Sequence, residues 1–404
     1  MNSLIISNFI KTKITKRQDS YFQKDIEVNK KLISAEIKGK SLLVIGGAGS
    51  IGSAFIHEAL KFNPARLYVF DINENGLAEL TRDLRSSIEK KVPGEYKTYP
   101  INFGNKLFEK ILKSVEPFDI IANFAAHKHV RSEKDHYSVS ALIENNILYA
   151  DGLLQLLEKY PPKHFFCVST DKAANPVNIM GASKSIMEEL ILSYAAIFPI
   201  TTARFANVAF SNGSLLDGFF YRMMKQQPLA TPTDIRRFFV SPEEAGQICL
   251  LSCVLGKSGD IFFPKFNPNE MVSFYDITVD YLKLMGYKMQ KCQSENEAKK
   301  LAALLNEKSL CYPVYCFRSE TSGEKTYEEF YTNKEKLDLN RFTSLGIIEN
   351  VNSKDRTKVN QFIKKLKITL NQDSLSKESL VKLFNEFLPD FHHIETNKSL
   401  DEKM

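Results

Sequence analysis

The sequence predicts an α/β fold built on a doubly wound parallel sheet. From residue 40 to residue 206, short apolar runs rich in β-branched and aromatic residues alternate with longer segments of helical spacing. This alternation is typical of parallel strands joined by helical crossovers. A glycine-rich segment follows the first apolar run, and an Asp-Lys pair follows a later one. Segments that follow parallel strands meet at one edge of the sheet, where such sheets bind ligands.

A glycine motif follows the first predicted strand. The strand covers 41–45 and a helix is predicted at 53–61, with Gly46, Gly49 and Gly52 between them. Glycines at this spacing permit a tight turn, the close approach of a pyrophosphate to the backbone, and close packing of helix on strand. The phosphates would lie at the N-terminus of the helix. The sequence therefore predicts a dinucleotide site at this turn.

An acidic residue ends the second predicted strand, 66–70. Asp71 follows the glycine motif by about 20 residues, where a carboxylate binds the ribose 2′-hydroxyl. The carboxylate of Asp71 would repel the 2′-phosphate of NADP, so NAD is predicted in preference to NADP. Arg82 and Arg85 would offset this repulsion if the loop folds back. The alternative is that Asp71 forms a turn or caps a helix before Asn73.

A second cluster of polar residues follows a later strand. The apolar run 164–168 is typical of a buried parallel strand, and after a loop the segment 180–196 has helical spacing. Met180 and Lys184 are one turn apart and therefore lie on the same face of this helix. An acid, two amines and a hydroxyl are thus expected to converge on one substrate. The candidate catalytic residues in this cluster are Thr170, Asp171, Lys172, Met180 and Lys184.

Simpler explanations exist for several of these residues. Asp171 and Lys172 could be a solvated ion pair in a surface turn, which would contribute little. Met180 could be core filler on an apolar helix face. His127 and His129 lack a third ligand at useful spacing, so no metal site is predicted.

Several motifs resemble those of the extended short-chain dehydrogenase/reductase superfamily. Within it, the chain resembles the nucleotide-sugar 4,6-dehydratases of bacterial polysaccharide biosynthesis, particularly UDP-N-acetylglucosamine 4,6-dehydratases. The resemblance runs from about residue 38 to about residue 342, and its most specific part is Ser-Thr-Asp-Lys at 169–172. The matching stretches are 46–52, 123–130, 169–176, 181–184, 204–208, 213–214, 236–239 and 323–329.

The resemblance implies an architecture. It implies a Rossmann domain that binds NAD at 38–210 and a smaller C-terminal substrate-binding domain mainly at 211–345, with tightly bound, recycled NAD. Residues 1–37 would form an N-terminal arm that packs on a neighbouring subunit of a homo-oligomer, and 346–404 a C-terminal extension with one predicted helix, 377–387. A charged amphipathic helix is also predicted at 295–307.

The resemblance also implies roles for individual residues. Lys128 is expected to neutralise phosphate charge, and Lys184 to bond the nicotinamide ribose. Asn146 is expected to support the site, with a helix-surface amide as the alternative. The implied cofactor-binding residues are Gly46, Gly49, Ser50, Ile51, Gly52, Asp71, Ala125, Ala126, Lys128, Asn146 and Lys184. The implied substrate-binding residues are Lys128, His129, Asn207, Ser214, Arg237 and Glu324.

Two departures from the family pattern limit this transfer. Most of the superfamily has Tyr four residues before the lysine that matches Lys184, whereas this chain has Met180. A methionine cannot take a proton from a substrate hydroxyl. A subgroup of the 4,6-dehydratases resembles this chain in having Met at that position. Where the family usually shows Arg-Pro before Gly-Glu-Lys, the chain has Thr321-Ser322, so Arg318 or Arg237 would have to supply the phosphate contact.

The implied chemistry is removal of water from a sugar. NAD takes a hydride from C4 and returns it to C6, and the ketone at C4 acidifies the C5 proton. Lys172, if neutral, removes that proton, and a nearby nicotinamide cation or Lys184 is expected to lower its pKa. Protonated Asp171 donates to the departing C6 hydroxyl. Lys172, Asp171 and Lys184 are candidates for taking the C4 hydroxyl proton, with Thr170 as an orienting group.

Two other function classes are open on the sequence. A nucleotide-sugar epimerase would use the same 4-keto intermediate, but it needs no acid and base for water loss. A non-catalytic dinucleotide-binding protein would have no use for Asp171 and Lys172. The nucleotide base, uracil or guanine, is not indicated by any residue, and retention at C5 is expected from the Met-bearing subgroup.

Bulk properties agree with a two-lobed cytoplasmic enzyme. The 404 residues carry a net charge of +6, which suits nucleotide diphosphates and falls short of a nucleic-acid-binding stripe. The six cysteines form no metal pattern and are expected to be free thiols. No run approaches the length of a membrane span, so no membrane insertion is expected.

Overall fold

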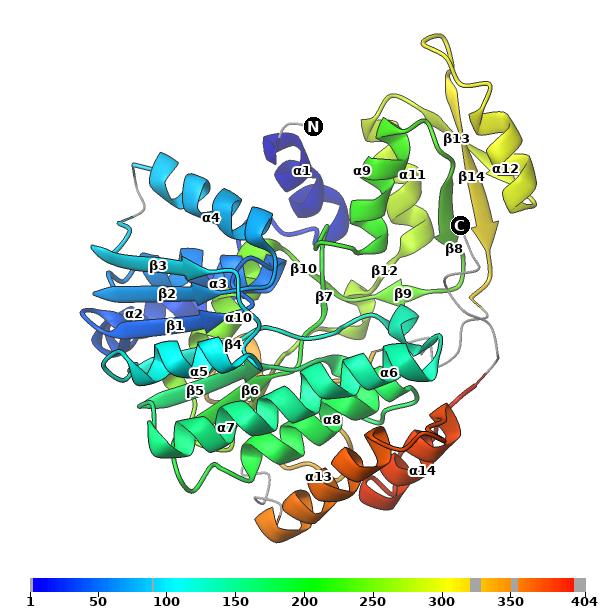
Figure 1. Ribbon diagram of the computed structural model, residues 1–404. Helices are drawn as coiled ribbons and strands as arrows, with labels where there is room; N and C mark the ends of the chain where they lie inside the picture. The colour runs from blue at the N-terminus through cyan, green and yellow to red at the C-terminus, as the bar shows by residue number, and fades with distance from the viewer. Residues whose placement is uncertain (1–2, 89–90, 320–327, 350–354, 396–404) are drawn as a thin grey trace.

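The computed structural model describes residues 3–88, 91–319, 328–349 and 355–395. Within these residues a nine-stranded sheet has the order β15-β16-β11-β6-β5-β4-β1-β2-β3 (Figure 1). Neighbouring strands are parallel from β3 to β11, and β16 is antiparallel to both of its neighbours. The strands are β1 (Ser41–Ile45), β2 (Arg66–Phe70), β3 (Glu95–Tyr99), β4 (Ile120–Asn123), β5 (His164–Val168), β6 (Ile200–Ala203), β11 (Ile261–Pro264), β15 (Leu337–Asp338) and β16 (Leu345–Ile348).

The direction of strand order reverses between β1 and β4. The chain passes from β1 through β2 to β3 on one side, and from β4 through β5 to β6 on the other. This reversal opens a crevice outside the carboxyl ends of β1 and β4. The segments that follow β1, β4 and β5 therefore meet there, and the predicted doubly wound parallel sheet is confirmed.

Helices cover both faces of the sheet (Figure 1). On one face α3 packs on α10, and α2 lies along α10. On the other face α7 packs on α8. The helices of this region are α2 (Gln23–Ile37), α3 (Ser50–Leu60), α4 (Glu74–Ser86), α5 (Lys106–Lys113), α6 (His136–Ile143), α7 (Tyr149–Lys159), α8 (Ile179–Leu192) and α10 (Pro242–Leu255). α3 begins at Ser50, three residues before the predicted start.

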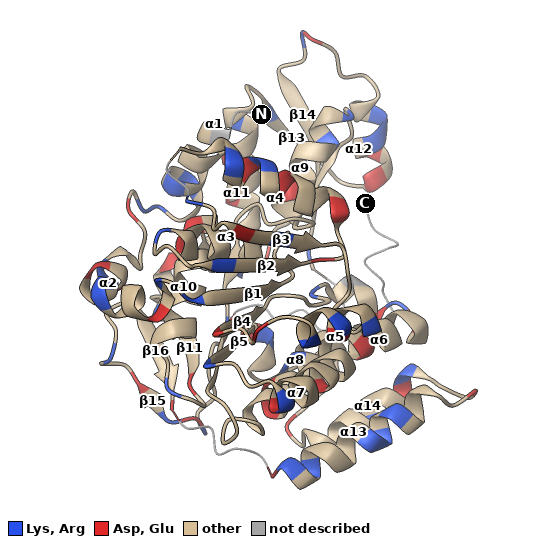
Figure 2. Cartoon of the chain, turned by 60° about the vertical axis from the view of Figure 1, so that its left-hand side comes forward, with Lys and Arg blue, Asp and Glu red and all other residues tan. Residues whose placement is uncertain are grey.

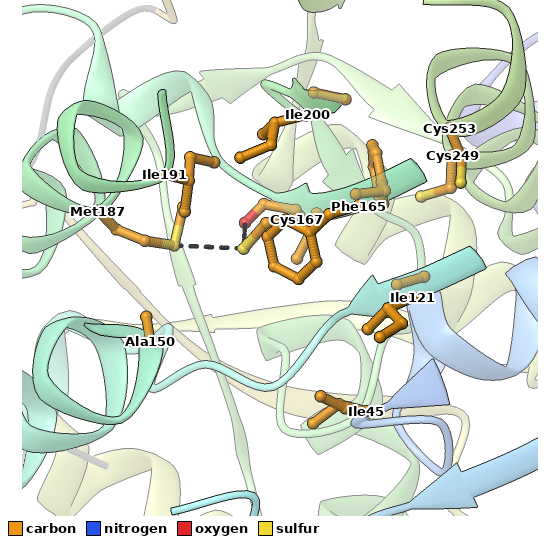
Figure 3. Packing of buried hydrophobic residues seen from close by; sticks show 14 of the residues in the cluster. Ile45, Ile121, Ala150, Phe165, Cys167, Met187, Ile191, Ile200, Cys249 and Cys253 are labelled. Carbon is orange, nitrogen blue, oxygen red and sulfur yellow. Dashed lines mark hydrogen bonds between the residues drawn. The ribbon is translucent and has the colours of Figure 1, made fainter. Parts of the chain in front are cut away.

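The core between β5 and α8 is apolar and closely packed. Cys167 of β5 points towards Met187 of α8, and their sulfur atoms lie 3.5 Å apart (Figure 3). Burial raises the pKa of Cys167 to about 11, so this thiol is inert. All six cysteines are free, as predicted.

A second lobe is built mainly from residues beyond 210. Its sheet has the order β13-β14-β8 and is parallel. Two short strand pairs, β10-β7 and β12-β9, lie between the lobes (Figure 1). The large sheet also takes β11, β15 and β16 from beyond residue 210, so the lobes interleave in sequence. The elements are β7 (Asn207–Val208), α9 (Leu215–Met224), β8 (Leu229–Pro232), β9 (Arg236–Arg237), β10 (Phe239–Val240), β12 (Val272–Ser273), α11 (Phe274–Leu284), β13 (Lys288–Cys292), α12 (Glu295–Ala302) and β14 (Cys311–Phe317).

The N-terminal segment packs within its own chain. It forms α1 (Ser3–Phe9), a π-helical turn (Ile10–Ile14) and α2. Phe9, Ile10 and Ile14 are buried in the core of the second lobe. Arg17 donates to Glu244 of α10 at 2.9 Å and to the carbonyl of Phe239 at 2.9 Å. These apolar side chains are therefore buried against their own chain, and an additional contact of this segment with a neighbouring subunit stays a prediction.

The C-terminal extension contains two helices where the sequence analysis predicted one. α14 (Lys377–Phe387) matches the predicted range, and α13 (Arg356–Leu370) precedes it. α13 packs on α8 (Figure 1). The buried residues of α13 lie on one face of the helix, and lysines stand between them in the sequence. These buried residues are Val359, Phe362, Ile363 and Leu366.

Charged residues are dispersed over the chain. Lys and Glu alternate along α14, whereas α13 carries Arg and Lys and no acidic residue (Figure 2). Among the residues described, no helix is both long enough and apolar enough to cross a bilayer.

Candidate active site

The glycine turn after β1 is shaped by steric contact. Gly46 has φ +74°, and a Cβ placed on it would lie 2.5 Å from the backbone nitrogen of Ala125. A Cβ on Gly52 would lie 2.3 Å from the carbonyl oxygen of Gly46, and one on Gly47 would lie 2.3 Å from Val69. Only glycine therefore fits at these positions. The role of Gly47 was not predicted, although it lies within the glycine motif.

The start of α3 faces the same crevice. Gly49 is the N-cap of α3, so the backbone N–H groups of Ser50 and Ile51 lie in its first turn. Free N–H groups at a helix start are a favourable place for phosphate. The hydroxyl of Ser50 accepts a hydrogen bond from Asn212 N–H at 2.9 Å. This bond joins the glycine turn to the loop that precedes α9.

Asp71 lies beside the glycine turn at the end of β2. Its Oδ2 accepts from Ala48 N–H at 2.9 Å, and its Oδ1 accepts from Asn73 N–H at 2.9 Å. The carboxylate therefore helps to form the turn, as the alternative interpretation expects, and its contact with a ribose stays a prediction. Arg82 pairs with Glu79, and Arg85 lies over the ring of Tyr96.

Asn146 connects the loop after β4 to α8. It lies in a π-helical turn (Glu144–Leu148) and is 2% exposed. Its Oδ1 accepts from His127 N–H at 2.8 Å, and its Nδ2 donates to His127 O at 2.9 Å and to Ser183 Oγ at 3.1 Å. The alternative of a surface amide is wrong, because both polar atoms are buried and bonded. Ala125 and Ala126 belong to this loop, next to Gly46.

Lys128 and His129 extend from that loop towards α9. Lys128 Nζ donates to Asn212 O at 3.1 Å, and burial lowers the pKa of Lys128. A Cβ on Gly213 would lie 3.2 Å from the ring of His129. Ser214 caps α9 by accepting from Asp217 N–H at 3.2 Å. These predicted substrate-binding residues thus gather beside the glycine turn.

Asp171, Lys172 and Thr170 form a compact group after β5. Lys172 Nζ lies 3.1 Å and 3.2 Å from the two oxygens of Asp171, and Thr170 Oγ1 donates to Asp171 Oδ1 at 2.7 Å. The Asp171 side chain is 5% exposed and that of Lys172 is 28% exposed. The pair is therefore largely withdrawn from water, which argues against a solvated surface ion pair.

The protonation of Lys172 differs from the expectation. Burial alone would lower its pKa, but the charges of Asp171 and Glu328 outweigh burial and Arg237, and the pKa of Lys172 is raised. The expected lowering of this pKa by Lys184 is corrected, because the largest charge effects on Lys172 come from Asp171, Glu328 and Arg237. Lys172 is thus an ammonium in this arrangement.

Met180 and Lys184 lie on the buried side of α8. Met180 is buried in the main core, which agrees with the interpretation of its side chain as core filler, and its N–H donates to Glu133 Oε1 at 2.8 Å. A catalytic role for Met180 stays a prediction. Lys184 Nζ donates to the Val168 carbonyl at 2.7 Å, and burial lowers its pKa. The amine therefore stands at the end of β5, and its contact with a ribose stays a prediction.

Glu328 is a member of the site that the sequence analysis did not single out. Its Oε2 accepts from Phe238 N–H at 2.8 Å, its Oε1 accepts from the Asn207 amide, and Arg237 Nε lies 3.7 Å from Oε1. Burial and the charge of Asp171 raise the pKa of Glu328 to about 8. The available signal was its place in the matching stretch 323–329. Glu324 of the same stretch lies outside the described residues.

No set of three or more His, Cys, Asp and Glu within the described ranges could hold a metal ion. The structure thus brings the predicted residues into two adjoining groups. One surrounds the glycine turn, and the other surrounds the end of β5.

Two curated proteins are similar to most of this chain. The chain is 29% identical over 362 residues to an uncharacterized membrane protein of Methanocaldococcus jannaschii, with 88% of this chain and 98% of that protein covered. It is 27% identical over 391 residues to the capsular polysaccharide biosynthesis protein CapD of Staphylococcus aureus, with 95% and 58% covered. The chain spans little more than half the length of the latter relative.

Two kinds of sugar-nucleotide enzyme match at the same identity. The UDP-N-acetylglucosamine 4,6-dehydratase (inverting) of Campylobacter jejuni is 28% identical over 238 residues, with 56% of this chain and 67% of the relative covered. A UDP-glucose 4-epimerase of Rickettsia typhi is 28% identical over 233 residues, with 56% and 66% covered. The chain is thus related to dehydratases and to epimerases.

Solved structures confirm the fold. Pen from Bacillus thuringiensis has a TM-score of 0.63 at 22% identity, with 88% of this chain and 98% of that one covered. The dTDP-glucose 4,6-dehydratase DesIV of Streptomyces venezuelae, with NAD bound, has a TM-score of 0.54 at 19% identity, with 72% and 88% covered. A family model described as polysaccharide biosynthesis protein matches residues 42–350, and the chain belongs to this family.

Proposed function

We propose that the chain is a UDP-N-acetylglucosamine 4,6-dehydratase, a hydro-lyase that forms a 4-keto-6-deoxy sugar nucleotide for surface-glycan or rare-sugar biosynthesis. The observation that carries the proposal is the buried Asp171–Lys172 pair with Thr170, at the end of a strand beside the glycine turn. An acid next to an amine is what elimination of water requires. Cytoplasmic location and a homo-oligomeric state stay predictions.

The residues around the glycine turn fit a bound NAD. The backbone at Gly46 and Gly52 leaves no room for a Cβ, which suits close approach of a pyrophosphate, and Asp71, beside this turn, would bind the ribose. Lys184 would hold the nicotinamide ribose. Bound there, NAD would supply hydride removal from C4 and hydride return to C6.

The protein's own groups would carry the protons. Thr170 would orient the C4 hydroxyl, Lys172 as an amine would remove the C5 proton, and Asp171 would donate to the departing C6 hydroxyl. Arg237 and Lys128 would offset the charge of the diphosphate. The raised pKa of Lys172 keeps its side chain protonated, so Lys172 has to lose a proton before it acts as a base.

The test uses purified protein, UDP-N-acetylglucosamine and no added cofactor. Mass spectrometry should show loss of one water, and NMR should show a keto or hydrated-keto carbon at C4, with the C5 coupling giving the stereochemistry. Asp171→Asn should abolish water loss while NAD stays bound, whereas Asp217→Asn, in the first turn of α9, should keep water loss. An unaffected rate in Asp171→Asn would contradict the assigned role.

An epimerase is the second candidate, because epimerases match the chain at the same identity as the dehydratase. It would change the C4 configuration at constant mass, so the same experiment separates the two. No change with UDP- or GDP-linked sugars, with or without added NAD, would favour a dinucleotide-binding protein.

A further inference from the structure

Arg204 is a buried base that the mechanism above does not use. It follows β6 directly, and its side chain is 5% exposed. All five N–H donors of its guanidinium are bonded. They reach both oxygens of Glu188 at 3.0 and 2.8 Å, both oxygens of Glu335 at 3.1 and 2.9 Å, and Phe330 O at 2.9 Å.

On one side, Arg204 supports the residues that follow β5. Glu188 of α8, which Arg204 binds, accepts from Ser169 Oγ at 2.5 Å. The carbonyls of the residues before and after Arg204 accept from Ser169 N–H at 2.8 Å and from Asp171 N–H at 3.3 Å. The backbone and the side chain of this arginine thus act on the same short stretch, which carries the proposed acid.

On the other side, Arg204 binds segment 328–335, which leads into β15. At the start of this segment, Glu328 accepts from the side-chain amide of Asn207 and lies 3.7 Å from Arg237 Nε. Asn207 and Arg237 are predicted substrate-binding residues. The segment therefore connects Arg204 to side chains that would hold the sugar nucleotide.

We propose that Arg204 is a positioning residue: through segment 328–335 it keeps Asn207 and Arg237 in register with the Asp171–Lys172 pair. A planar guanidinium that is bonded along both edges lets neither side shift alone. The inference rests on the proposed function, in which the first two residues bind the substrate and the pair acts on it.

Glu335→Gln breaks only the half of this network that faces the segment. Glu335 is 17% exposed, and its loss as a carboxylate leaves Arg204 and Glu188 as a balanced buried pair, so the variant should fold. The matched control is Glu349→Gln, which makes the same chemical change in an ion pair with Lys336.

The first test needs no turnover and measures how firmly Glu328 is held. The N–H of Phe238 donates to Glu328 Oε2 at 2.8 Å, seven residues before Glu335. Hydrogen exchange at Phe238, followed by mass spectrometry, should be about tenfold faster in Glu335→Gln and unchanged in Glu349→Gln. Exchange in β2 serves as the reference for global opening. Wild-type exchange at Phe238 in Glu335→Gln overturns the proposal.

The second test separates KM from kcat in the dehydratase assay. Glu335→Gln should raise KM for UDP-N-acetylglucosamine by about tenfold, with kcat changed by less than about threefold and NAD content unchanged. Glu349→Gln should keep both constants. A purely structural role would lower the folded fraction and leave KM as it is, so a wild-type KM in Glu335→Gln overturns the proposal.

Arg204→Lys covers the case in which Glu335→Gln does not fold. A lysine keeps the charge but has three donors and no planar fork, so it cannot bind both carboxylates and Phe330 O together. KM should again rise about tenfold, and a wild-type KM would refute the positioning role. A wild type without dehydratase activity would instead refute the proposed function, and the exchange at Phe238 would then decide whether Arg204 holds the segment.

Discussion

At the residue scale, short contacts decide which substitutions the glycine turn tolerates. A methyl group on Gly52 would press on the carbonyl of Gly46 at 2.3 Å, and neither backbone segment can move away easily. A methyl group on Gly152 of α7, in contrast, would meet no heavy atom within 4 Å beyond its own helix backbone. The two glycines therefore form a matched pair.

We predict that Gly52→Ala abolishes NAD binding and lowers the free energy of unfolding by about 1–3 kcal/mol through overpacking. Gly152→Ala should keep NAD binding and gain about 0.5–1 kcal/mol, because alanine favours helix. Bound NAD, released by denaturation and assayed, and urea unfolding report both effects. Full NAD content in Gly52→Ala would contradict the role of the turn.

We also predict that one residue, Asp71, determines the preference for NAD over NADP. Asp71→Ser removes the carboxylate that stands beside Ala48 and should raise the affinity for NADP relative to NAD by about tenfold or more. Titration of cofactor-free protein with both nucleotides measures the ratio. An unchanged ratio would mean that Asp71 serves only the turn.

Much of the site was predictable because its residues are neighbours in sequence. Thr170, Asp171 and Lys172 are adjacent, and the strand before them has a plain apolar pattern. Glu328 was not singled out because its partners lie far away in the chain, and no local pattern reports a tertiary contact. The direction of the Lys172 pKa shift was missed for the same reason, since Glu328 contributes to it.

At the element scale, the C-terminal extension contacts the loop that follows Lys172. Ile394 N–H donates to Val177 O at 3.0 Å, in the loop between Lys172 and α8. His393 Nε2 lies 3.7 Å from Glu133, the carboxylate that accepts from Met180 N–H at the start of α8. The loop and the helix start are thus both held by residues that follow α14.

We predict that deletion of residues 389–404 lowers kcat by about tenfold or more while NAD stays bound, because the loop that carries Lys172 loses these contacts. Deletion of 396–404 alone keeps His393 and Ile394 and should leave kcat unchanged. Steady-state assays of both variants test this. Equal rates in both would show that the loop needs no support from the extension.

The sequence predicted the strands of this region better than its last helices. The strands at 41–45, 66–70 and 164–168 were placed at their observed bounds, because apolar runs between polar residues are distinctive. α13 was not predicted, because lysines interrupt its apolar positions in the sequence and weaken the helical pattern. The predicted helix at 295–307 ends earlier, at Ala302.

At the scale of the whole molecule, stability should depend on a partly buried histidine at the amino end of β5. His164 Nε2 lies 2.8 Å from Thr201 Oγ1, which donates to Ser252 O, so the imidazole N–H donates to Thr201. Burial lowers the pKa of His164 to about 4. In the unfolded chain the imidazole titrates near 6.5.

Between about pH 6.5 and pH 4, the unfolded chain therefore binds a proton that the folded protein does not. The free energy of unfolding should fall across this window, by roughly 3 kcal/mol from this one group. Urea unfolding of the wild type and His164→Gln across the window measures it. The free energy of unfolding of His164→Gln should fall less steeply with decreasing pH than that of the wild type. Identical pH dependence in the two proteins would exclude His164 as the cause.

Long-range contacts also join the two ends of the chain. Asp25 of α2 is 3% exposed, and its two oxygens accept from Thr343 N–H and Ser344 N–H, each at 2.7 Å. A ribosome makes Asp25 long before it makes Thr343, and Phe9 and Ile10 likewise wait for the second lobe. During synthesis the first helices therefore stay unfinished and their apolar side chains exposed, so the nascent chain depends on protection from aggregation until Thr343 and Ser344 have emerged.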